Sequence, residues 1–77
     1  MSPKLPRITG AEVIRALRRA GWYIQHHHGS HAYLRHTEHP GMRITVAVHA
    51  GETIKPKTSQ SILKQAGLSV AEFQELL

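Results

Sequence analysis

The sequence contains no cysteine, and its 77 residues include only one tryptophan, one phenylalanine and two tyrosines. Without cysteine the chain cannot form a disulfide framework, a thiolate zinc finger or a cysteine nucleophile. It also lacks the run of ~20 apolar residues that a membrane-spanning helix needs, and the apolar core of a signal peptide. A chain of this length forms one small core, which leaves little room for a bulky organic cofactor. We therefore expect one cytoplasmic domain over residues 1–77, with no cofactor and no membrane partner.

Acidic residues are scarce as well: five Asp and Glu stand against ten Lys and Arg, which gives a formal charge of +5 at pH 7. The positive excess lies in residues 1–50, where seven Lys and Arg face only Glu12 and Glu38. A basic domain of this kind suits a polyanionic partner, because every neutralised phosphate releases condensed counterions. Nucleic acid is therefore one interpretation of the charge, and simple solubility is the other.

A capping box at Thr9-Gly10-Ala11-Glu12 predicts a helix that begins after Thr9 and ends at Gly21. One side of this helix is apolar at the helical period, through Val13, Leu17 and Ala20. The other side is basic, through Arg15, Arg18 and Arg19. This basic side is either an ordinary solvated face or a contact for phosphate or for a partner.

Three segments with the composition of β-strands follow, over residues 22–25, 31–36 and 43–48. Pro40-Gly41 marks the turn before the third. The second and third segments alternate, which turns one set of side chains inward: Ala32 and Leu34, then Ile44, Val46 and Val48. The second segment leaves a polar set exposed: His31, Tyr33 and Arg35. Because the connections are short, we predict an antiparallel meander with one exposed face.

Two helices are predicted after the strands. Thr58 is the expected N-cap of a helix over about 59–66, and Gly67 is its expected C-terminal glycine. Ser69-Val70-Ala71-Glu72 is a second capping box, which opens a short final helix with apolar positions at Val70, Phe73 and Leu77. The element order α-β-β-β-α plus a short helix predicts an α+β fold, with helices on one face of a three-stranded antiparallel sheet. This architecture resembles the double-stranded-RNA-binding fold.

All seven histidines lie between positions 26 and 49, a clustering that suggests a metal site: His26, His27, His28, His31, His36, His39 and His49. Zinc needs three or four converging ligands that are held by second partners. Adjacent histidines on a strand point to opposite faces, and Glu38 is the only carboxylate in this window. We therefore expect no metal site, and a metal-binding protein is kept as a third functional hypothesis.

Gly29-Ser30-His31 is the motif with the clearest chemistry: a flexible glycine, a hydroxyl, and a histidine at the start of an exposed strand face. Histidine titrates near neutral pH, so it can take a proton from a ribose 2′-hydroxyl or give one to a leaving 5′-oxygen. RNA carries its own nucleophile in that 2′-oxygen, so its cleavage needs only acid–base help and stabilisation of charge. From the residues alone, His31 is either such a catalytic group or an ordinary surface histidine.

Four stretches together give the chain a resemblance to a known family: Gly21-Trp22 through Gly29-Ser30-His31, His39-Pro40-Gly41, Thr45-Val46-Ala47-Val48-His49, and Ser61-Ile62-Leu63-Lys64-Gln65-Ala66-Gly67-Leu68. In this order they resemble the HicA toxins of bacterial toxin–antitoxin pairs over nearly the whole chain. The resemblance implies a ribosome-independent mRNA interferase with His31 as its catalytic residue. It also places Gly29 and Ser30 in an RNA-binding motif and implies a HicB-type antitoxin as the protein partner.

The chain departs from this family before the second helix, where Pro56-Lys57-Thr58-Ser59-Gln60 replaces the frequent Lys-Gly-Thr-Leu-Arg. Ser59 thus stands in an apolar position, and we expect it to loosen the local packing. Lysines partly replace the lost RNA contacts, and we predict that they bind phosphate beside the free amides of the helix start: Lys55, Lys57 and Lys64. Solvated charge is the other interpretation of these lysines. A non-catalytic RNA-binding module is the main alternative to an endoribonuclease.

Overall fold

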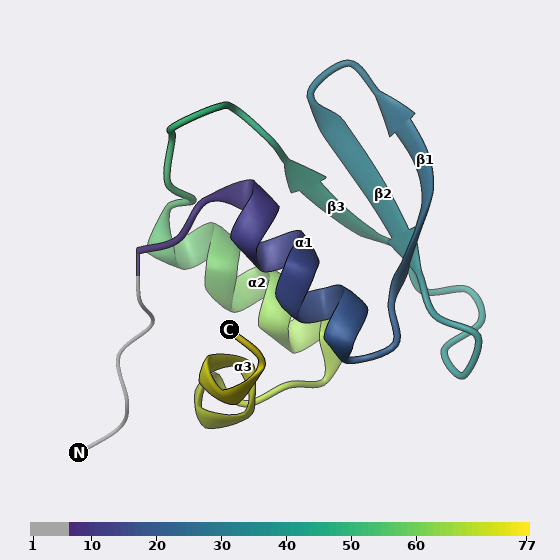
Figure 1. Cartoon of the computed structure of the whole chain (residues 1–77). Coiled ribbons are helices and arrows are strands. Elements are labelled where there is room, and N and C mark those ends of the chain that lie inside the picture. Colours follow the sequence, from purple (N-terminus) through teal and green to yellow (C-terminus); the bar gives the residue numbers. More distant parts are fainter. Residues whose placement is uncertain (1–6) are drawn as a thin grey trace.

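A computed structural model describes residues 7–77 of the chain. Its elements follow in the order α1 (Gly10–Arg19), β1 (Tyr23–His28), β2 (His31–Arg35), β3 (Ile44–Ala47), α2 (Pro56–Ala66) and α3 (Val70–Leu76). The strands form one antiparallel sheet in the order β1-β2-β3, and α1 and α2 lie on one side of it (Figure 1). The predicted α+β fold, with an open three-stranded sheet and an extra short helix, is confirmed.

The core fills the space between the sheet and the helices. Four of the five strand residues predicted to point inward are fully buried: Ala32, Leu34, Ile44 and Val46. The fifth, Val48, is half-buried and lies outside β3, which ends at Ala47. The helices cover them with a matching set of buried side chains: Val13, Leu17, Ile62, Leu63 and Phe73. Since these contacts use only one face of the sheet, the opposite face of β2 is left to solvent and carries polar side chains.

The capping box predicted at the start of α1 is present. The Glu12 backbone N–H donates to Thr9 Oγ1 at 3.3 Å, and the Thr9 backbone N–H donates to Glu12 Oε1 at 3.0 Å. The Glu12 carboxylate also accepts from the Thr9 hydroxyl at 3.1 Å. The hydrogen bonds from the Thr9 backbone N–H and from this hydroxyl lower the pKa of Glu12 below its ordinary value of 4.5. The helix ends where Gly21 takes a φ of +99°, and a Cβ there would lie 2.5 Å from His36 Nε2. Only glycine fits this position without displacing that ring.

β1 is longer than the sequence pattern predicts. It begins at Tyr23, one residue after the buried Trp22, and it continues through the three consecutive histidines to His28. The prediction that the strand ends at Gln25 is therefore wrong. The polar residues are in the strand because β2 supplies hydrogen-bonding partners for them, in a register that pairs His26 with Tyr33 and His28 with His31. A bulge between Ile24 and His26 sets this register.

α2 begins earlier than predicted, because Lys55 and not Thr58 is the N-cap residue. Pro56 fits the first helical position, where its missing N–H and its fixed φ carry no penalty, so the helix extends by one turn. This start places Ser59 toward the core, where it is 3% exposed. Its Oγ finds no hydrogen-bond partner among residues 7–77. The structure therefore shows a buried, unpaired hydroxyl at the position where we expected looser packing.

The C-terminal part of the chain largely follows its sequence signals. Gly67 ends α2 with a φ of +71°, and the Leu68 N–H donates to the Leu63 carbonyl at 3.0 Å. Ser69 and Glu72 form the second capping box, whose backbone hydrogen bond lowers the pKa of Glu72. Leu77 is the exception: it is 40% exposed, and Leu76 packs against the core in its place. Within residues 7–77 no helix has the length and apolar character needed to cross a membrane.

Candidate functional site

The side of the sheet that faces away from the helices, here called the open face, gathers the polar residues of all three strands. Residues paired directly across an antiparallel sheet point to the same side, so the register places His26 beside Tyr33 and His28 beside His31. On the other flank of β2, Tyr33 pairs with Thr45 and His31 pairs with Ala47. The structure therefore places the predicted exposed residues of β2 between two further rows of side chains.

His31 is the first residue of β2 and lies at the end of the sheet where the β1–β2 hairpin turns. It is exposed, and its ring makes no hydrogen bond or ring contact with any other residue in 7–77. The Val48 N–H donates to the Ser30 carbonyl at 2.6 Å, which ties the hairpin turn to the end of β3. The backbone around His31 is thus held on both sides, while its imidazole is free to meet a ligand.

Gly29 and Ser30 form the two-residue turn that presents His31. Gly29 takes a φ of +59°, a conformation that L side chains rarely adopt. No atom of residues 7–77 lies within 4 Å of the position that a Cβ would take there, so this part of the structure leaves the turn open. Ser30 is half-buried and is engaged through its backbone carbonyl, since its hydroxyl forms no hydrogen bond within residues 7–77. The motif therefore acts first as a tight turn that points His31 outward.

Rings on β1 and β2 form a second feature of the open face. His26 stacks with Tyr33 at a centroid distance of 6.0 Å and an interplanar angle of 24°, and it stacks with His28 at 6.3 Å and 22°. Arg43 Cζ lies over the Tyr33 ring, 4.9 Å from its centroid. Together with Gln25 these four residues line a hollow, here called the ring hollow. The sequence prediction missed it because β1 was ended at Gln25. The alternation of His26 and His28 was the available signal.

Two other histidines have structural roles at the far end of the sheet. His39 stacks on Trp22 at 5.8 Å and 9°, and His36 packs edge-on against the same ring at 5.3 Å. The Glu38 N–H donates to His36 Nδ1 at 3.1 Å, so His36 Nε2 carries the hydrogen that faces the Ala20 carbonyl at 3.1 Å. The histidines are thus split between separate sites. Among residues 7–77, no three His, Asp or Glu side chains are grouped as a metal ion would require.

The predicted lysines are exposed but are not brought together. Lys55 is the N-cap of α2, and it lines a shallow hollow with His49 and with Ala47, the pairing partner of His31. Lys57 lies in the first turn of α2. Lys64 lies seven residues further along on the same side of the helix, a distance of about 10.5 Å along the axis. Lys55 therefore borders the strand next to His31, whereas Lys64 lies near the opposite end of the helix.

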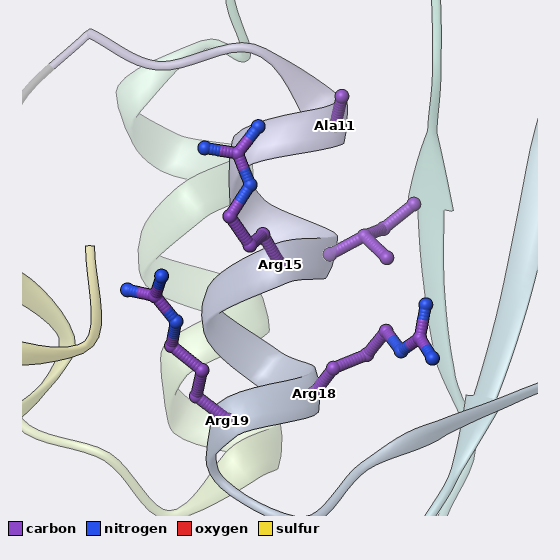
Figure 2. A pocket seen from close by; sticks show the side chains of 5 residues that line it. Ala11, Arg15, Arg18 and Arg19 are labelled. Carbon is purple, nitrogen blue, oxygen red and sulfur yellow. The ribbon is translucent and has the colours of Figure 1, made fainter.

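The basic side of α1 forms a separate exposed surface (Figure 2). Its hollow is lined by Ala11, Ile14, Arg15, Arg18 and Arg19. Arg19 is already engaged, since its Nη1 donates to the carbonyl of Leu76 at 2.8 Å and to that of Leu77 at 3.1 Å. The arginine tethers the end of α3 to α1. Arg18 extends to the other side of α1 from Arg15 and Arg19 (Figure 2), so the three guanidinium groups do not converge.

The structure is thus a small basic domain with an open polar sheet face and an exposed histidine at its hairpin. The family model described as the HicA toxin of bacterial toxin–antitoxin matches residues 10–68, which span α1, the sheet and α2. The protein is therefore a toxin of a bacterial toxin–antitoxin system. More particularly, the chain belongs to the HicA toxin family, as its sequence motifs predict. A search of curated proteins finds no match to this chain.

Proposed function

We propose that this toxin is a ribosome-independent endoribonuclease that cleaves mRNA in the cytoplasm, with His31 as an acid–base catalyst. The observation that carries the proposal is the position of His31: it is exposed, free of partners in residues 7–77, and held at a fixed hairpin on the open face. The proposal treats residues 1–77 as one toxin domain. Within the described residues, Arg19 supports this because it joins α3 to the part that the family model matches, and residues 1–6 lie outside that description.

The proposed reaction uses the 2′-hydroxyl of the RNA. A base takes the 2′-hydroxyl proton as the 2′-oxygen attacks phosphorus, and an acid gives a proton to the departing 5′-oxygen. The products are a 2′,3′-cyclic phosphate and a 5′-hydroxyl. This route needs no metal or organic cofactor, because the nucleophile belongs to the substrate.

One histidine cannot serve as base and acid in the same step, so a second group is required. His28 is the register partner of His31 and points to the same face, and within residues 7–77 the two rings do not contact each other. Both residues are exposed, so a phosphodiester bound on this face can meet both imidazoles. We therefore assign His28 as the second proton-transfer group.

Phosphate binding in this proposal comes from the backbone of the turn and from lysines. The backbone N–H groups of Gly29 and Ser30 lie beside His31. Lysines at the N-cap and on the exposed side of α2 supply positive charge for the phosphates of the RNA strand: Lys55, Lys57 and Lys64. Lys55 is the best supported of the three, because it shares a hollow with Ala47 next to His31. Lysines at such positions contribute point charge that is independent of RNA sequence.

A gel of messenger RNA incubated with the purified protein in EDTA tests this function against its alternatives. Cleavage in EDTA supports the histidine mechanism. A shifted but intact RNA band would favour a non-catalytic RNA-binding module, an alternative that the ring hollow also supports. Cleavage or binding only after a metal ion is added would favour a metal-dependent protein.

A HicB-type antitoxin is proposed to neutralise the toxin by covering the open face. The face carries cationic and imidazole groups around His31, and an acidic partner would both find it by charge and exclude RNA from it. Hydrogen exchange with and without antitoxin should show protection over β2. Protection confined to residues 70–77 would contradict masking of the site.

A further inference from the structure

The ring hollow lies directly beside His31 on the open face. His28 lines it and is also the register partner of His31, and Tyr33 lies two residues along β2 from His31, at a spacing of about 7 Å. Its three rings are stacked at interplanar angles of 22° and 24°. Three planar side chains therefore gather on the open face beside the proposed cleavage position.

We propose that the ring hollow binds one unpaired base of the RNA strand, next to the phosphate that His31 cleaves. This inference rests on the proposed function and specifies the form of its substrate, a locally single-stranded RNA. The base stacks on the Tyr33 and His26 rings, and Arg43 supplies positive charge at the border of the hollow.

The charges around the hollow favour a polyanion. Among residues 7–77 no acidic side chain lines it, and Arg43 contributes a guanidinium group. Arg35 is engaged, since its Nε donates to Gln25 Oε1 at 3.1 Å and its Nη1 donates to the Met42 carbonyl at 3.3 Å. Because Arg35 uses the Gln25 oxygen, the amide N–H groups of Gln25 are available to donate to the edge of a base.

The lining also separates an unpaired base from other occupants. A base in a duplex has its faces covered by neighbouring pairs, so it cannot stack on a ring of the protein. The exposed large hydrophobic residues within 7–77 do not line the hollow: Tyr23, Met42 and Leu77. Aromatic rings with one cation and one amide are the composition of single-strand binding sites.

Binding of a single-stranded RNA decamer that carries one 2-aminopurine tests the proposal, since the fluorescence of this base is quenched when it stacks. The protein carries His31→Ala so that it does not cut. In this background Tyr33→Leu should weaken binding about tenfold and abolish the quenching, whereas Tyr33→Phe should retain both. The salt slope should be unchanged by Tyr33→Leu, because stacking releases no counterions, while Arg43→Gln should lower it by ~0.7.

Arg18→Gln on α1 is the charge-matched control and should leave affinity and slope unchanged. Because Tyr33 is half-buried, the exposed His26→Ala variant repeats the test without touching the packed ring, and circular dichroism confirms the fold. Equal binding by Tyr33→Leu and Tyr33→Phe would overturn the base site. The same holds if Tyr33→Leu weakens antitoxin binding alone, which would assign the hollow to a protein.

The proposed base site and the proposed function are refuted by different results. If the chain without substitutions cuts RNA and the Tyr33 and His26 variants bind as it does, only the base site is wrong. If it neither binds nor cuts single-stranded RNA, the proposed function itself is wrong.

Discussion

Replacement of Ser59 by alanine removes a hydroxyl that the fold buries without a partner. The residue is 3% exposed on the inner side of α2, and its Oγ forms no hydrogen bond within residues 7–77. A buried polar group that is left unpaired costs ~1–3 kcal/mol. Ser59→Ala also gains the higher helix propensity of alanine, about 0.5 kcal/mol in a helix interior.

We therefore expect Ser59→Ala to raise the free energy of unfolding by about 1.5–3.5 kcal/mol. In a domain of this size each kcal/mol raises Tm by ~4–8 °C. Ser61→Ala is the matched control, because Ser61 is exposed on the same helix and gains only the propensity part. Urea denaturation of the three proteins gives both differences, and unchanged m-values would show that the denatured states are alike.

A gain at Ser59 no larger than the gain at Ser61 would refute the reasoning, because it would mean that the buried hydroxyl carries no penalty.

Three further predictions concern the helix starts, the lysines and the second histidine. The lowered pKa values of Glu12 and Glu72 stabilise the fold at pH values above the unfolded pKa, and this stability is lost as pH falls through the folded pKa values. The double variant Glu12→Ala, Glu72→Ala should therefore lose less stability than the unsubstituted chain between about pH 7 and about pH 3, with Glu52→Ala as the control. Equal losses would contradict the capping account. Glutamine at Lys55, Lys57 and Lys64 should weaken RNA binding by the His31→Ala protein for all RNA sequences alike, and it should lower the salt slope of binding by ~0.7 per lost contact. A larger effect of glutamine at Arg15 and Arg18 would place the RNA along α1. His28→Ala should flatten one limb of the pH–rate profile, whereas His27→Ala, on the opposite face, should leave both limbs intact. Identical profiles for the two variants would remove His28 from the acid–base pair.

Features fixed by neighbouring residues were predictable from the sequence. Both capping boxes, the glycine end of α2 and the inward alternation of β2 depend on interactions within a few residues, and the structure has them. The fold class followed from these local signals together with the short connections between strands. The motif that presents His31 was visible for the same reason, because a glycine turn before an alternating strand is a local pattern.

Features that depend on distant residues were missed. β1 continues past Gln25 because β2 pairs with it, and the polar composition of its last residues gave no sign of this. The start of α2 shifted to Lys55 because Pro56 could open the helix without a side-chain cap. The ring hollow joins Tyr33 on β2 with Arg43, which precedes β3, so the alternation of His26 and His28 could indicate only its β1 side before the register was known.

The chemistry assigned to His31 is tested most directly by the cleavage rate of a defined RNA in EDTA, compared between the chain without substitutions, His31→Ala and His27→Ala. We predict that His31→Ala lowers the rate by ~10²–10⁴ with a native circular dichroism spectrum, while His27→Ala cuts at close to the unsubstituted rate. The products should carry a 2′,3′-cyclic phosphate and a 5′-hydroxyl, and a 2′-deoxy nucleotide at the cleaved position should block the reaction. Undiminished cleavage by folded His31→Ala, or cleavage at the 2′-deoxy position, would contradict the mechanism.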